Sequence, residues 1–163
     1  MRNDEILTYI NILISTLKNK EALLLKLKDE TVRQESLIDA QEFDADEFDK
    51  TINVKQGYID ELLKLDDGFM GIYEKIKDPV KENSADYKPE MEIVKALIKK
   101  QTELSIELQT LESKNQTGLS IHMARGKQKV REFNTNSKTV AAYYKNMTNR
   151  HQDGDSYFLD RKK

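Results

Sequence analysis

The sequence predicts an all-α protein: an elongated antiparallel helical hairpin followed by a long third helix, a coiled-coil-like three-helix bundle, with a C-terminal amphipathic arm. Three observations predict this fold class. Apolar residues recur at alternating spacings of three and four, the pattern of helices packed on helices. The only two prolines, Pro79 and Pro89, lie ten residues apart, so long stretches contain nothing that stops a helix. Strand-like alternation extends over no more than a few residues.

The first two helices are expected over residues 4–40 and 46–78, joined by a short acidic connection. Asn3 or Asp4 can cap the first, and Asp44 or Asp46 the second, because their side chains accept bonds from free N–H groups. The first apolar stripe consists of Ile6, Ile10, Leu13, Leu17, Lys20, Leu24, Leu27, Thr31 and Ile38. The second consists of Phe48, Ile52, Lys55, Ile59, Leu62, Asp66, Phe69, Tyr73 and Ile76. The short connection makes the two helices an antiparallel hairpin.

The third helix is expected over residues 89–118, after a polar linker at 79–88, with Pro89 in its first turn. Its stripe consists of Val94, Leu97, Leu104, Leu108 and Leu111. At Gly118 the stripe slips by one residue, and at roughly 100° per residue the later apolar residues face another direction. We therefore predict a helical bundle over residues 1–118 and a separate C-terminal arm over 119–163.

The arm combines apolar anchors with the polar run 134–139, which has weak helix propensity. A segment of this kind can fold on contact with a partner helix. The residues predicted to bind the partner are Leu119, Met123, Val130, Phe133, Val140, Tyr143, Tyr144, Met147, Tyr157, Phe158 and Leu159. Two alternatives stay open: the arm folds back on the first two helices, or it closes a homodimer.

Three polar residues, Lys20, Lys55 and Asp66, interrupt the stripes of the hairpin. Reflecting the hairpin about its turn near residue 43 places Lys20 opposite Asp66 and Lys55 opposite Thr31. We expect a partly buried Lys20–Asp66 pair that fixes the register, because a slipped alignment would leave a charge without its partner. The alternative is that both side chains reach water at the edge of the stripe.

Composition argues against several classes of partner. Charged residues make up 34% of the chain, with a net charge of −2 and both signs interspersed, which favours neither nucleic acid nor an anionic membrane. The longest uncharged apolar-rich run, residues 6–17, is 12 residues long and too short for membrane insertion. The chain has no cysteine, which is typical of a reducing compartment and predicts a cytoplasmic protein.

The residues that carry chemistry predict no enzyme, no cofactor and no metal site. His122 and His151 are the only histidines, and without cysteine they exclude a His/Cys zinc site. His122 is expected to be solvated. The acidic run 39–49 lacks the glycine and the bidentate glutamate of a calcium loop, so we interpret it as a capping turn. The glycines are scattered singly and form no phosphate-binding loop.

Several segments together resemble one family. Residues 37–43, followed by Phe48, Lys55 and the leucine-rich stretch 62–65, resemble the first hairpin of FlgN-type flagellar export chaperones. Residues 111–115 resemble the stretch before the last helix of such proteins, and 134–147 and 156–163 resemble their tails. The resemblance implies a small cytosolic helical chaperone for type III flagellar export. It would bind the C-terminal helices of hook-filament junction (hook-associated) proteins, prevent their premature assembly and deliver them to the export gate.

The slip at Gly118 and the polar run 134–139 depart from the continuous last helix of that family. Two hypotheses of different class therefore remain. In one, the chain is an export chaperone, a monomer or weak dimer whose arm folds when a partner helix arrives. In the other, it is a structural coiled-coil protein whose arm closes a symmetric oligomer.

Overall fold

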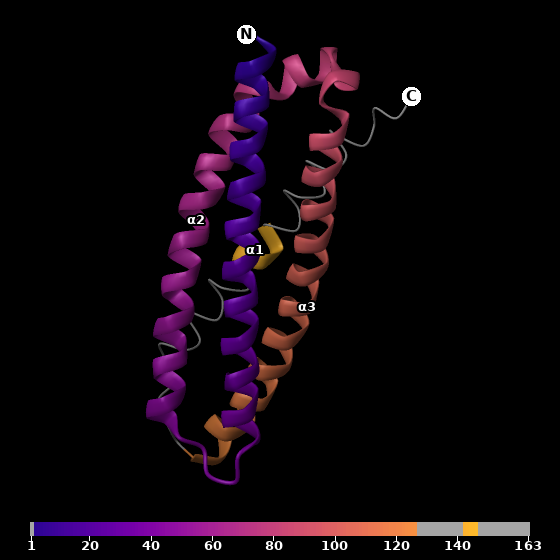
Figure 1. Ribbon diagram of the computed structural model, residues 1–163. Helices are drawn as coiled ribbons and strands as arrows, with labels where there is room; N and C mark the ends of the chain where they lie inside the picture. The colour runs from indigo at the N-terminus through magenta and orange to yellow at the C-terminus, as the bar shows by residue number, and fades with distance from the viewer. Residues whose placement is uncertain (1, 127–141, 147–163) are drawn as a thin grey trace.

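The structure is a computed structural model, and it describes residues 2–126 and 142–146. Three long helices, α1 (Asn3–Asp39), α2 (Ala45–Glu82) and α3 (Lys88–Gly126), form an elongated bundle, in which α2 runs antiparallel to α1 and α3 runs parallel to α1 (Figure 1). A 3-10 turn, η1 (Ser84–Tyr87), connects α2 to α3. The predicted all-α class is confirmed: the described residues contain helices and no strand.

The helix α1 is the common partner of the other two. In the described part of the chain, α2 and α3 each pack along α1 rather than along one another. The start of α1 and the α2–α3 connection lie at one end of the bundle, and the α1–α2 turn and the end of α3 lie at the other (Figure 1). No described helix meets the length and apolarity needed to cross a membrane.

The buried side chains form three apolar clusters along the bundle axis. The first cluster surrounds the start of α1 and includes Ile10, Leu13, Ile76, Tyr87, Met91 and Val94. The second, midway along, contains Leu23, Leu24, Leu27, Ile59, Leu62, Leu104, Leu108, Tyr143 and Tyr144. The third lies at the α1–α2 turn and contains Ile38, Phe48, Ile52 and Leu119. Each cluster draws residues from α1, α2 and α3, so the three helices share one continuous core.

The helix starts match the predictions to within one residue, and of the two predicted caps the one at α2 is confirmed. At α2, Asp44 is the N-cap, and its carboxylate accepts a bond from the N–H of Glu47 at 3.1 Å. At α1, the predicted cap at Asn3 or Asp4 is wrong, because Arg2 occupies the N-cap position without a side-chain bond. The Asn3 side chain instead accepts a bond from the Tyr87 hydroxyl at 2.8 Å, which ties the start of α1 to η1.

The predicted end of the second helix at residue 78 is wrong. The helix continues through Pro79 to Glu82, so most of the predicted linker 79–88 is helical. Proline removes one N–H donor from a helix interior. The neighbouring side chains of Ile76 and Val80 are 1% and 3% exposed, and their burial in the first cluster keeps the chain helical across the proline.

The predicted slip and helix end at Gly118 are also wrong. Buried positions continue along α3 at spacings of three and four up to the third cluster: Met91, Val94, Ile98, Gln101, Ser105, Leu108, Glu112, Asn115 and Leu119. The apolar pattern breaks because polar residues hold several of these core positions. By contrast, Leu97 and Leu111 are only partly buried. Leu119, placed in the arm by the prediction, is 1% exposed within the bundle.

Gly118 permits close contact between α1 and α3 near the end of the bundle. A Cβ at this position would lie 2.6 Å from Cγ2 of Ile38, which is nearer than packed atoms approach. The helical glycines Gly57, Gly68 and Gly71 have nothing within 4 Å of such an atom. Gly118 is therefore required for packing, whereas these three glycines of α2 face open space.

Gly118→Ala is expected to destabilise the protein by about 1–3 kcal/mol, because the added methyl group overpacks the contact with Ile38. Gly71→Ala is the matched control and is expected to stabilise by about 0.5–1 kcal/mol through helix propensity. Urea unfolding followed by circular dichroism measures both changes. A stabilising effect of Gly118→Ala would contradict the close contact.

Candidate functional site

The candidate site is the place where the described helical residues 142–146 pack on all three long helices. Its side chains Tyr143 and Tyr144 are 7% and 0% exposed. Figure 1 shows this turn in yellow, beside α1 and between the other helices. We call residues 142–146 the docking turn. The docking surface beneath it consists of Leu23, Leu24, Leu27, Ile59, Leu62, Leu104 and Leu108 with the polar residues Asp66, Ser105 and Gln109.

Hydrogen bonds join the docking turn to both α2 and α3. The Tyr143 hydroxyl donates to Oδ2 of Asp66 on α2 at 3.0 Å. On α3, Ser105 Oγ and Gln109 Nε2 donate to the Tyr144 carbonyl at 3.0 and 3.4 Å. These two side-chain donors attach the backbone of the docking turn to α3. The docking turn therefore bridges two helices that otherwise pack on α1.

Asp66 belongs to a polar layer between the first and second apolar clusters. The expected Lys20–Asp66 pair is present, with Lys20 Nζ 2.6 Å from Oδ1 of Asp66. The two residues are 5% and 6% exposed, so they do not reach water at the edge of the stripe. In the same layer, Gln101 Nε2 donates to the Leu17 carbonyl at 2.6 Å. Asp66 thus accepts bonds from the core of the bundle and from the docking turn.

A second polar layer separates the second and third clusters. Lys55 Nζ donates to Gln34 Oε1 at 2.9 Å and to Oε1 of Glu112. Thr31, the residue predicted opposite Lys55, also reaches Glu112, with its Oγ1 3.3 Å from Oε1, and Asn115 Nδ2 donates to the Thr31 carbonyl at 2.9 Å. Burial lowers the pKa of the Lys55 ammonium, and the Glu112 carboxylate opposes that effect. This layer connects all three helices through buried hydrogen bonds.

Four polar core residues of α3 were not found from the sequence: Gln101, Ser105, Glu112 and Asn115. They were missed because the stripe was followed through apolar residues alone. A strict spacing of three and four continued from Met91 through every residue type would have reached all four. Two of them, Ser105 and Glu112, contact or influence the docking turn.

The predicted partner-binding residues divide into two groups. Four lie within the bundle: Leu119 and Met123 in the third cluster, and Tyr143 and Tyr144 in the second. The others, Val130, Phe133, Val140, Met147, Tyr157, Phe158 and Leu159, lie outside the described residues. The expectation that the four described residues face away from the bundle is wrong. Their role toward a partner stays a prediction.

His122 was expected to be solvated, but in the structure it is packed against neighbouring residues. Its ring stacks on Phe43, with 4.7 Å between the ring centres. Its Nε2 lies 2.5 Å from the Ile38 carbonyl in the last turn of α1, and since a carbonyl only accepts, Nε2–H is the donor. His122 thereby attaches the end of α3 to the α1–α2 turn. Within residues 2–126 and 142–146, no three metal-ligating side chains gather to hold an ion.

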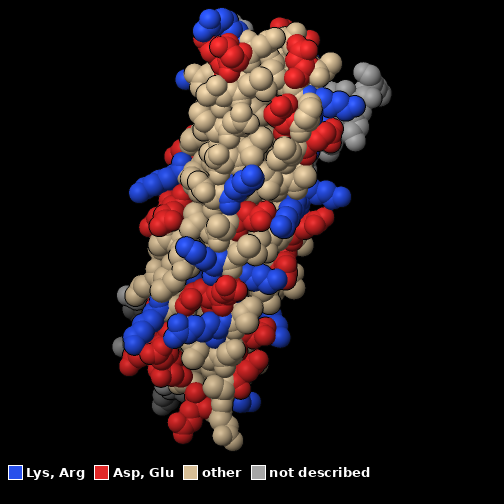
Figure 2. Space-filling view, in the orientation of Figure 1, with Lys and Arg blue, Asp and Glu red and all other residues tan. Residues whose placement is uncertain are grey.

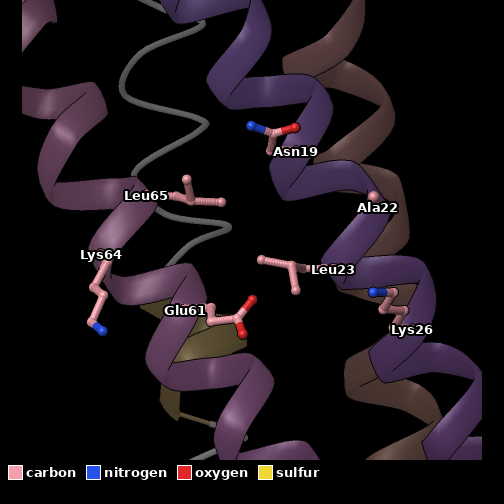
Figure 3. Close-up of a pocket in the computed structure, with 7 residues that line it drawn as sticks. All are labelled: Asn19, Ala22, Leu23, Lys26, Glu61, Lys64 and Leu65. Atoms are coloured by element: carbon pink, nitrogen blue, oxygen red, sulfur yellow. The ribbon is translucent and has the colours of Figure 1, made fainter.

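A surface hollow of about 410 Å³ lies between α1 and α2 and shares Leu23 with the docking surface. Leu23 and Leu65 point toward one another across it, and Glu61 extends from α2 (Figure 3). Its other lining residues are Asn19, Ala22, Lys26 and Lys64. Figure 2 shows acidic and basic side chains interspersed over the visible face of the bundle. The mixed charges of the hollow follow that pattern and favour no ligand of a particular charge.

Comparisons of the chain with protein-family models, with curated proteins and with solved structures found no match. The docking surface and the residues that carry the family resemblance are therefore the features of this chain that bear on its function.

Asp66→Ala is expected to destabilise the protein by about 3–5 kcal/mol, because it removes the carboxylate that neutralises the buried Lys20 ammonium. The double variant Lys20→Met/Asp66→Leu is expected to recover most of this loss, since it replaces the pair with apolar side chains. Denaturant unfolding of both variants tests the comparison. A loss below about 1 kcal/mol in Asp66→Ala would argue against a buried pair.

The docked Tyr144 is expected to ionise at a higher pH than an exposed tyrosine. Burial first, and the Glu112 carboxylate second, raise the pKa of Tyr144 well above its ordinary value of 10.0. Its contribution to stability is therefore complete below pH 10 and decreases as the pH rises above 10 toward the folded-state pKa. A phenolate absorbance titration of wild type and Tyr144→Phe checks this. If the phenolate absorbance of wild type already exceeded that of Tyr144→Phe at pH values below 10, Tyr144 would ionise like an exposed tyrosine, and this would contradict its burial.

Proposed function

We propose that this protein is a cytosolic chaperone for flagellar type III export that binds the C-terminal helices of hook-associated proteins. The observation that supports the proposal is the docking turn, a helical segment packed on a surface built from three helices. Clustered leucines with a few fixed polar groups are the usual chemistry of surfaces that bind an amphipathic helix. The docking surface has this composition.

The family resemblance supplies the class of partner. Residues 37–43 and the segments 134–147 and 156–163 are similar to FlgN-type chaperones. The resemblance implies that the partner helix is kept from premature assembly until it reaches the export gate. Binding would cover the apolar face of that helix, and a few buried anchors would supply most of the affinity. The interspersed charges of the chain favour recognition by such burial rather than by a long-range field.

The alternative function, a structural coiled-coil protein that self-associates through its arm, has less support. Leu119, Tyr143 and Tyr144 pack within their own chain, so these anchors are already buried in a single copy. A symmetric oligomer built on them would first have to release them from the bundle.

Titration of the full chain with C-terminal fragments of hook-filament junction proteins tests the proposal. We expect saturable binding of roughly micromolar affinity, observed by calorimetry, with a gain of helix in circular dichroism as the fragment folds. An unrelated amphipathic helix of equal length and net charge serves as the control. Absence of binding, together with a stable oligomer whose melting depends on protein concentration, would favour the structural alternative.

A further inference from the structure

We infer that the docking surface selects a partner helix that carries a hydroxyl-bearing aromatic side chain, and that this helix displaces the docking turn of the chain itself. The inference deepens the proposed function and rests on it. It identifies where the partner helix binds and what that helix must present.

The hydroxyl requirement follows from the position of Asp66. Asp66 is 6% exposed, and its Oδ1 lies 2.6 Å from Lys20 Nζ. Its Oδ2 accepts the Tyr143 hydroxyl at 3.0 Å. An aromatic ring without a hydroxyl fills the same apolar space but does not supply this bond to a buried carboxylate. Losing a bond to a buried charge is more costly than losing a neutral one, so the surface distinguishes tyrosine from phenylalanine.

Displacement follows from how few side chains anchor the docking turn. Of its residues, Tyr143 and Tyr144 are buried, whereas Ala142, Lys145 and Asn146 are exposed. The two tyrosine anchors and the bonds to α2 and α3 hold it in place. An amphipathic helix that adds further apolar anchors to the same chemistry would bury more apolar area on the same surface.

Vacating the docking surface would be unfavourable. The leucines of the second cluster would lose their packing against Tyr143 and Tyr144, and the carboxylate of Asp66 would lose the bond from Tyr143. Tyr144, the neighbour of Tyr143, lies near enough to the second polar layer for the Glu112 carboxylate to contribute to the raised pKa of its phenol. The docking turn therefore occupies the site until a partner helix with equivalent anchors takes it over.

The test uses a synthetic peptide of residues 138–149 and its Tyr143→Phe version as probes. The receptor is the full chain with Tyr143→Ala and Tyr144→Ala, which removes both anchors of the docking turn. The matched control is the full chain with Lys145→Ala and Asn146→Ala, two exposed positions of the same turn. We expect the peptide to bind the anchor-free receptor saturably, and the Tyr143→Phe peptide to bind about tenfold more weakly. Wild type and control should bind the peptide much more weakly, because their attached turn competes at an effective concentration of roughly millimolar.

A second measurement does not depend on the folding of the anchor-free variant. The chain has no cysteine, so Lys145→Cys provides a single site for a spin label on an exposed position of the docking turn. Addition of a hook-filament junction fragment should mobilise the label if the docking turn leaves. A fragment that contains tyrosine should do so at a concentration about tenfold lower than its phenylalanine version.

Equal binding of the tyrosine and phenylalanine peptides would overturn the selection. Fragment binding that leaves the label immobile would overturn the displacement while the proposed function stands. If the fragments bind neither wild type nor the anchor-free chain, the proposed function fails, and the displacement by such a partner fails with it. A dimer abolished by Tyr143→Ala/Tyr144→Ala would make a second copy the occupant and would also overturn the displacement.

Discussion

The need to pair charges inside a narrow three-helix core is the constraint on which the remaining structure depends. Lys20 and Asp66 join α1 to α2, and Lys55 and Glu112 join α2 to α3, at core positions between apolar clusters. A bundle held by aliphatic layers alone tolerates several alignments. A shift of either pair would leave a buried charge without its partner, at a cost of several kcal/mol. The two polar layers therefore fix the register of the helices, and the leucine layers supply most of the stability.

The same alignment creates the docking surface. Lys20 binds one oxygen of Asp66, and the other oxygen accepts the hydroxyl of Tyr143. Ser105 of α3, four residues beyond the core position Gln101, donates to the Tyr144 carbonyl of the docking turn. A rigid frame of three helices thus presents leucines together with a fixed acceptor and fixed donors. Such a frame suits a protein in which a partner helix replaces the docking turn, and this links the architecture to the proposed chaperone function.

Much of the fold was predictable because it depends on residues close in sequence or related by one short turn. Candidate capping residues and Pro89 located all three helix starts to within one residue. Reflection about the acidic turn aligned Lys20 with Asp66, because antiparallel helices joined by a short connection pair in mirror order. The helix ends were less accessible. Pro79 predicted the end of the second helix, but the burial of its neighbours keeps the chain helical there. Gly118 predicted the end of the third helix, whereas in the structure it permits a close contact with Ile38.

The order of amino acids alone specified helices, the hairpin and its register, because periodicity and turn length are local properties of the chain. Packing in three dimensions assigned Glu112 and Asn115 to the core, since a polar residue is recognised as buried only when its partners on other helices are known. It also placed Tyr143 beside Asp66, a residue 77 positions earlier in the chain. No local pattern encodes that contact, because it depends on the surface that α1, α2 and α3 form together.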